Sequence, residues 1–435
     1  MENQKISDAM NFIDKEEDAM VDALRNAIAI PALSPEKGGE GELKKIEYLE
    51  TLIKKFDLAD YAEITRYDTP VGYMPDTENP ERKSEIVRPN LIIKIKGDGT
   101  HEETKWGLAH VDIVDPGNPE KWDSTGGDPY KLTIKGRDMH GRGVEDNGQS
   151  MISLLFAVKA MKEHNIIPKY NVNVAFVSDE ETQSDFGFKY LLKQDIFKKG
   201  DMFLVPDFGE PTGATIEIAE KSIVHMDAKF MGKQVHGSVP GRGVNPTDMA
   251  DDFSYLIRKR LYEEFSNKNE LFGPQESTFE ATSVIGTSTT ENNIIPEENL
   301  RKYDFRILPE YDAEDVMKLV EKTKEEIIDK YTNRTKDYEF TPGIEINARI
   351  EKAGPATPQD SRIVDDLSKS IKEVYGVETK TIGIGGGTFG GIIRKYGFDA
   401  AVWSKIYENA HEVNEKANID NLVNDAKVFT IFFSR

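Results

Sequence analysis

Residues 149–181, QSMISLLFAVKAMKEHNIIPKYNVNVAFVSDEE, predict a helix lying on a sheet, followed by a strand of that sheet. Apolar side chains recur along one face of the helix at the spacing of its turns: Met151, Leu154, Leu155, Val158 and Met161. The strand NVNVAFV then runs into the acidic residues 179–181. This order indicates an α/β layer in which buried strands end in polar side chains.

The same alternation continues on both sides of this stretch. Further strands are predicted at LIIKIKG (91–97), WGLAHVDIV (106–114), FLVPDF (203–208), TIEIAE (215–220) and, after a helix at 361–376, DAAVWS (399–404). We expect a mixed, mainly parallel sheet flanked by helices.

The middle of the chain has another pattern. It predicts strands near 222–232, 278–288, 300–308 and 337–350, and helices near 246–264 and 312–331. The order β-α-β-β-α-β is typical of a ferredoxin-like α+β domain. We therefore expect a first domain formed by residues 1–221 and 354–435, interrupted by an inserted domain at 222–353.

Composition limits the functions open to this chain. A length of 435 residues suggests two or three domains, and 38% hydrophobic with 31% charged residues is typical of a soluble globular protein. The net charge of −22 argues against a general binder of nucleic acids or anionic membranes. Without cysteine, a metal must be held by nitrogen and oxygen. With no signal peptide or membrane span recognisable, we expect a cytoplasmic protein.

Three strand ends carry candidate site residues. His110 and Asp112 follow an apolar run, Glu180 and Glu181 end the next strand, and Asp207 lies in VPDFG. Open α/β sheets place their sites at this edge. Taken singly, each has an ordinary alternative, such as a surface His–Asp pair, a chance acidic pair or a turn-forming aspartate.

Two further candidates lie on loops. Asp146, in HGRGVEDNGQS, is either a helix N-cap or a metal ligand on a glycine-rich turn, and His411 lies among acids that could form a solvated loop. Together with the strand ends they supply two imidazoles and several carboxylates, as two divalent cations bridged by one carboxylate require. Cations would also relieve the repulsion between these acids.

Nine strings, in order from about residue 90, resemble one family of co-catalytic zinc amidohydrolases that includes bacterial dipeptidases, glutamate carboxypeptidase, aminoacylase, acetylornithine deacetylase and succinyl-diaminopimelate desuccinylase. The strings are GLAHVDIVDPG, HGRGVEDNGQS, VSDEET, VPDFG, GKQVHGSVPGRGVNP, NNIIP, YDFRILP, GIGGGTFGG and AHEVNE.

The resemblance implies a role for each site residue. His110, Asp146 and Asp207 would hold one divalent metal, and Glu181, His411 and the same Asp146 the other. Asp112 would orient His110, and Glu180 would be the general base acting on the attacking water. Zinc is expected, with manganese or cobalt as alternatives. The resemblance also implies a cis peptide after Asp146.

The inserted domain resembles the family's lid. The resemblance implies that His236 stabilises the oxyanion, and that the substrate is bound by Arg306, Asn293, Gly386, Gly387 and Thr388. The ordinary alternatives are a half-buried polar His236 and an Arg306 paired with an acid. A lid of this size favours a homodimer.

We expect a dipeptidase or carboxypeptidase acting on small peptides. The alternative is a deacylase of N-acyl amino acids, because both reactions cleave an amide beside a carboxylate. A nucleotide-binding protein is a remote alternative: Gly385, Gly387 and Gly390 satisfy GxGxxG, but no complete dinucleotide-binding unit follows. A scaffold without chemistry would have no need of Glu180.

Overall fold

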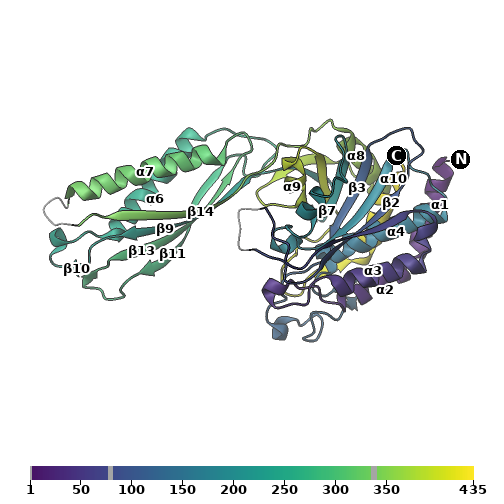
Figure 1. Ribbon diagram of the computed structural model, residues 1–435, viewed down its shortest axis with the longest axis horizontal. Coiled ribbons are helices and arrows are strands. Elements are labelled where there is room, and N and C mark those ends of the chain that lie inside the picture. Colours follow the sequence, from purple (N-terminus) through teal and green to yellow (C-terminus); the bar gives the residue numbers. More distant parts are fainter. Residues whose placement is uncertain (1, 77–81, 335–339) are drawn as a thin grey trace. The chain divides into compact units, whose positions relative to one another are not determined.

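The structure, a computed structural model, describes residues 2–76, 82–334 and 340–435 (Figure 1). These residues form two compact units. Unit 1 contains the chain up to Ile218 together with Thr357–Thr381 and Thr388–Arg435, and unit 2 contains Ala219–Ala356 and Ile382–Gly387. The segment 222–353, expected as an insertion, lies within unit 2.

The main sheet of the structure is mixed, with parallel strands at its centre. Strands β6, β3, β7 and β16 pair in parallel, whereas β1 with β2, β2 with β6, and β16 with β8 are antiparallel. The strands, in sheet order, are β1 (Glu63–Thr69), β2 (Arg88–Ile95), β6 (Asn171–Val177), β3 (Thr104–His110), β7 (Met202–Gly209), β16 (Asp399–Ser404), β8 (Thr215–Glu220) and β15 (Lys380–Ile384). The expected α/β class is confirmed.

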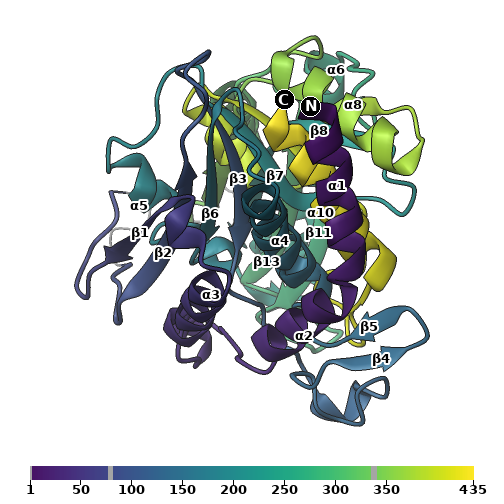
Figure 2. The same ribbon diagram turned by 90° about the vertical axis from the view of Figure 1, so that its right-hand side faces the viewer.

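Helices cover both faces of this sheet. Helix α4 (Ser150–Glu163) packs on β3 and also on α1 (Glu2–Lys15) and α10 (Ile419–Ser434) (Figure 2). We expected α4 to bury one face, but nearly all its residues are buried, because α1 and α10 cover its outward side. Gly107 permits the close approach, since an added Cβ would lie 2.8 Å from side-chain atoms of Leu154 and Phe433.

The opposite face of the sheet carries a second apolar layer. Trp106, Leu108, Phe203 and Val402 pack there with Phe389 of α9. The other helices and the small sheet of unit 1 are α2 (Glu17–Ile28), α3 (Leu43–Lys55), α5 (Phe188–Leu192), α8 (Arg362–Tyr375), α9 (Phe389–Lys395), β17 (Lys416–Asn418), β5 (Asp138–His140) and β4 (Thr133–Lys135).

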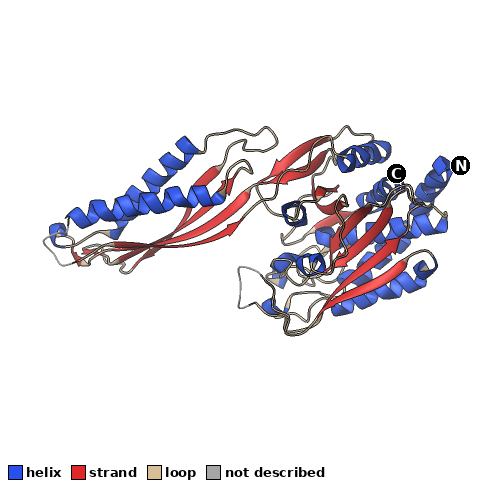
Figure 3. Ribbon diagram, turned by 45° about the horizontal axis from the view of Figure 1, so that its top comes forward, coloured by secondary structure: helices blue, strands red, loops and turns tan. Residues whose placement is uncertain are grey.

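Unit 2 has the expected β-α-β-β-α-β order. Its antiparallel sheet runs β11-β13-β9-β14, and two helices cover one face (Figure 3). The elements are β9 (Ser222–Met231), α6 (Pro246–Glu264), β11 (Thr278–Thr287), β13 (Glu298–Ile307), α7 (Ala313–Arg334) and β14 (Gly343–Glu351), with a short pair β10 (Val235–His236) and β12 (Ile294–Ile295). Residues 337–339 of the predicted last strand lie outside the described residues.

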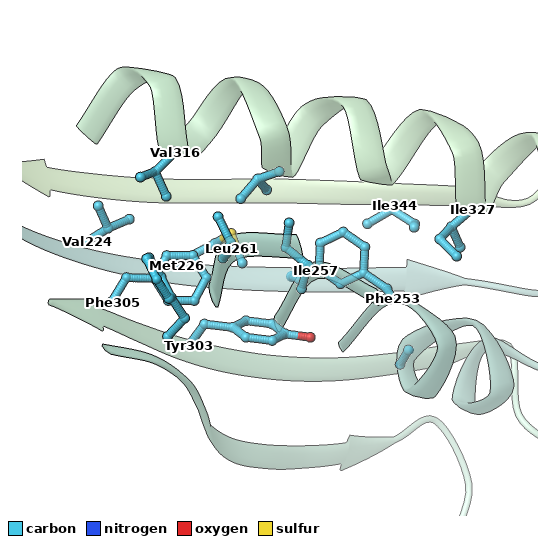
Figure 4. Packing of buried hydrophobic residues seen from close by; sticks show 14 of the residues in the cluster. Val224, Met226, Phe253, Ile257, Leu261, Tyr303, Phe305, Val316, Ile327 and Ile344 are labelled. Carbon is cyan, nitrogen blue, oxygen red and sulfur yellow. The ribbon is translucent and has the colours of Figure 1, made fainter. Parts of the chain in front are cut away.

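Alternating apolar residues form the core of unit 2. Val224 and Met226 of β9 lie in one buried cluster with Phe253 of α6 and Val316 of α7 (Figure 4). This alternation explains why the helices cover a single face, since every second strand residue points the other way. In the described part of the chain, no helix has the length and apolar character needed to cross a membrane.

Candidate metal centre

Three neighbouring strands bring polar side chains to one edge of the main sheet. His110 is the last residue of β3, Asp207 lies near the end of β7, and Glu180 and Glu181 follow β6 after a short turn. Because β6, β3 and β7 are parallel neighbours, their carboxyl ends meet at the same edge. The strand-end placement read from the sequence is therefore what brings these side chains together.

Asp146 lies between two imidazoles. Its Oδ1 atom is 2.8 Å from Nε2 of His110, and its Oδ2 atom is 3.1 Å from Nε2 of His411. His411 also lies 3.1 Å from Oε2 of Glu181, and His110 lies 3.2 Å from Oδ1 of Asp207. One carboxylate thus faces both histidines, although His110 and His411 are three hundred residues apart in the sequence.

The donor set fits divalent cations. Ligand atoms of His110, Glu180 and Asp207 lie within 4.8 Å of one another, as do those of His110, Asp146 and Glu181. Imidazole nitrogen and carboxylate oxygen are the ligands that zinc, manganese and cobalt accept in proteins. Glu180 comes as close to His110 and Asp207 as a ligand would, so its carboxylate is placed to bind a metal or to act as a base beside it.

Asp112 holds the loop that carries the two glutamates. Its buried carboxylate accepts the backbone N–H groups of Glu180 (3.1 Å) and Glu181 (3.0 Å). The Nδ1 atom of His110 lies 3.1 Å from the Asp112 carbonyl oxygen and 3.5 Å from the Asp112 carboxylate. Asp112 therefore contacts His110, as the sequence suggested, and also fixes the neighbouring loop, for which the sequence carried no signal.

The crowded charges shift the pKa values of the site. Burial opposes protonation of His110, but hydrogen bonds to Asp112, Asp146 and Asp207 raise its pKa well above the ordinary value. Hydrogen bonds to Asp146 and Glu181 raise the pKa of His411 to about 10. Burial raises the pKa of Glu180 well above its ordinary range and that of Glu181 to about 7. Without cations, bound protons thus balance part of the negative charge of these carboxylates.

Asp146 lies in an irregular turn before α4. The peptide bond between Asp146 and Asn147 is cis, as the resemblance implied, and both residues have non-helical backbone angles within the segment Val144–Gln149. Asn147 donates its side-chain N–H to Asp207 (2.8 Å) and to the carbonyl of Pro206 (2.8 Å). The alternative of a plain helix N-cap does not describe Asp146, because α4 begins at Ser150.

Two buried acids near the site carried no signal in the sequence. Glu415 is fully buried and accepts N–H groups from the loop of Asp146, so the solvated acidic loop considered for this segment is wrong at this residue. Glu145, beside Asp146, is also buried and accepts N–H groups from the segment before His411. Both look like ordinary acids in a chain with 78 of them.

The buried carboxylate of Asp179 pairs with arginines. Its carboxylate accepts N–H groups from Arg82 (2.9 Å to Oδ2) and from Phe186 (2.9 Å), and Arg88, which also pairs with Glu42, lies 3.3 Å away. The acidic residues 179–181 thus have two kinds of surroundings: Asp179 is held by arginines, and Glu180 and Glu181 lie beside histidines.

The expected lid residues belong to unit 2. His236 is exposed, and its Nδ1 accepts the N–H of Ser238 at 3.1 Å. Arg306 pairs with Asp304 through two bonds of 2.7 and 2.9 Å and donates to the carbonyl of Gly385 at 2.6 Å, as in the ordinary alternative. The side chain of Asn293 is exposed, and its carbonyl accepts the N–H of Gly237.

The glycine-rich turn has free space beside Gly386 and Gly387. A Cβ added at Gly386 or Gly387 would meet nothing within 4 Å. Thr388, the first residue of the turn that belongs to unit 1, caps α9 by accepting the N–H of Gly390 at 3.0 Å. The hydroxyl of Thr388 therefore has a structural partner within its own helix.

Comparisons with known proteins identify related sequences and a similar fold. A sequence model of peptidase family M20/M25/M40 matches residues 108–435. An uncharacterized metallohydrolase of Methanocaldococcus jannaschii is 37% identical over 407 residues, covering 92% of this chain and 95% of that protein. A succinyl-diaminopimelate desuccinylase of Orientia tsutsugamushi is 25% identical over 325 residues, covering 74% and 77%. The fold is similar to that of the dipeptidase Dug1p of Saccharomyces cerevisiae, with a TM-score of 0.67, 18% identity and coverage of 100% and 98%.

Metal binding should release protons from this site. In the metal-free protein His411, with a pKa of about 10, is protonated at pH 7, whereas a metal binds only the neutral imidazole. Metal affinity should therefore fall as the pH is lowered and rise as it approaches 10. Calorimetric zinc titrations at pH 7, in buffers of different ionisation enthalpy, should show proton release. Equal heats in all buffers would contradict the predicted protonation of His411.

Proposed function

This chain belongs to peptidase family M20/M25/M40 and is a metal-dependent amide hydrolase, and we propose that it is a dipeptidase or carboxypeptidase that cleaves the amide bond next to a substrate carboxylate. The observation that carries the proposal is the position of the Asp146 carboxylate between the imidazoles of His110 and His411. A carboxylate placed in this way can bridge two cations, and a pair of cations suits hydrolysis of an amide.

We assign the ligands as two overlapping sets. His110, Asp146 and Asp207 would hold one divalent ion, and Asp146, Glu181 and His411 the other. When bound, the ions would polarise the scissile carbonyl and make water more acidic. Zinc is the metal we propose, and manganese and cobalt suit the same nitrogen and oxygen donors.

Glu180 is the proposed general base. Its carboxyl group lies beside His110 and Asp207 on a half-buried residue, and desolvation together with the charge of Asp207 raises its pKa well above the ordinary value. A carboxylate of raised basicity can accept a proton from the attacking water and return it to the leaving amine. Asp112 keeps this carboxylate in place through the backbone N–H of Glu180.

Two residues of unit 2 are proposed to act on the substrate. The N–H of Ser238 points to Nδ1 of His236, which leaves the His236 proton on Nε2, and an N–H donor suits a developing oxyanion. Arg306 would bind the substrate carboxylate after its Nη1 group leaves the carbonyl of Gly385. Asn293, Gly386, Gly387 and Thr388 are proposed to complete the substrate contacts.

The cytoplasmic location stays a prediction.

Replacing Glu180 with glutamine tests the assignment of the base. The amide cannot accept the proton, so we expect the Glu180→Gln variant to lose hydrolysis by at least about 100-fold, the lower end of general-base contributions, and to keep both metal ions. Activity assays and metal analysis on the same preparation provide the measurement. Full activity would refute the role as base, whereas loss of a metal ion would identify Glu180 as a ligand.

The substrate class can be tested with a hydrolysis panel. We expect cleavage of dipeptides in preference to N-acetyl- and N-succinyl-amino acids, with zinc, manganese or cobalt added in parallel. The resemblance to desuccinylases makes a deacylase the second candidate, because its substrates present the same amide beside a carboxylate. Cleavage confined to the acylated compounds would reverse the order of the two candidates.

We further propose a homodimer formed through unit 2. Strand β11 lies at the edge of its sheet, with β13 as its neighbour, and it exposes Val284 and Ile285. Exposed apolar edge strands are prone to pair with another chain. Light scattering should give twice 49.0 kDa, and Val284→Asp should lower this mass, whereas Ile167→Asp, on unit 1, should not. A wild-type monomer would refute the proposal.

A further inference from the structure

Two buried glutamates tie together the loops that carry Asp146 and His411. Glu145 and Glu415 are 3% and 0% exposed, and both lie in unit 1. Glu145 immediately precedes Asp146, and Glu415 follows His411 by four residues. Each of the two ligands therefore has a buried carboxylate close to it in the chain.

Glu145 accepts hydrogen bonds from the His411 loop. Its Oε2 atom accepts the backbone N–H of Tyr407 at 2.6 Å and the side-chain N–H of Asn409 at 3.1 Å, and its Oε1 atom accepts the backbone N–H of Asn409 at 2.8 Å. Both oxygens of the carboxylate are thus used by a segment that ends two residues before His411.

Glu415 makes the reverse connection. Its Oε1 atom accepts the backbone N–H groups of Glu145 (2.9 Å) and Asp146 (3.1 Å), and its Oε2 atom accepts that of Gly143 (2.8 Å). Arg142 donates to Glu415 at 2.6 Å and to the carbonyl of His411 at 3.2 Å, so the negative charge of Glu415 is balanced locally.

We propose that Glu145 and Glu415 are positioning residues that together set the separation of Asp146 and His411. They would thereby set the affinity of the second metal position, the one formed by Asp146, Glu181 and His411. The inference rests on the proposed two-metal function. Each loop supplies a carboxylate to the N–H groups of the other, so neither loop can shift without breaking several buried hydrogen bonds. The first position does not depend on this connection in the same way, because His110 and Asp207 lie on strands of the sheet.

Glu145 is the better of the two for a test. Glutamine has the shape of glutamate, but its amide nitrogen would face an N–H group where the second carboxylate oxygen now accepts one. Glu145→Gln should therefore loosen the His411 loop without opening a cavity. Glu217→Gln is the matched control, because Glu217 is a fully buried acid of unit 1 that pairs with Arg394.

The experiment is a zinc titration of the metal-free full chain, with metal content measured after equilibrium dialysis. We expect two zinc ions in the wild type and in Glu217→Gln. In Glu145→Gln we expect one ion bound as in the wild type and the other about 10–100-fold more weakly, the usual effect of removing a group that orients a ligand. Excess zinc should restore the second ion.

Three outcomes would count against the proposals. Two ions bound to Glu145→Gln with wild-type affinity would overturn the inference alone. An equal loss of zinc affinity in Glu217→Gln would do the same, because it would indicate general destabilisation. Fewer than two ions in the wild type would overturn the proposed function and the inference with it. If Glu145→Gln does not fold, Asn409→Ala removes the Asn409 side-chain bond to Glu145, and it should weaken the same ion.

Discussion

The contact on which the site of unit 1 depends is the one between the Asp146 carboxylate and two imidazoles. Each oxygen of this carboxylate faces a different histidine, His110 on the sheet and His411 on a loop near the end of the chain. Three more carboxylates stand within reach of the same histidines. Such a gathering of acids is stable only when cations or protons balance it, which is why the pKa values of both histidines are raised.

A second group of buried acids keeps the first in place. Asp112 accepts backbone N–H groups from the loop of Glu180 and Glu181, Glu145 from the loop before His411, and Glu415 from the loop of Asp146, whereas Asp179 is held by arginines. Hydrogen bonds from backbone N–H groups stabilise a buried carboxylate without adding a side chain that could itself bind metal. Asp112, Glu145 and Glu415 thus link the loops of the clustered residues through backbone hydrogen bonds.

Much of the fold was predictable from local patterns, whereas the roles expected of the site residues came from the resemblance of nine strings to one family. The β-α-β-β-α-β order followed from periodicity, and His110 and Asp207 were recognisable because they stand where buried strands end. Glu145 was not predictable, because its carboxylate contacts a loop more than 260 residues away and no local pattern encodes such a contact. The burial of α4 on all sides was missed for the same reason, because the covering helices come from the two ends of the chain.

The span of the ligands along the chain has a consequence for biosynthesis. His411 is the last of the clustered residues in the chain, and strand β16, which lies in the interior of the main sheet, begins only at Asp399. A nascent chain lacks both until residue 411 has been synthesised, and contacts of such long range form late. Products that stop before residue 399 would lack both β16 and His411, and Asp146 would then face one imidazole instead of two.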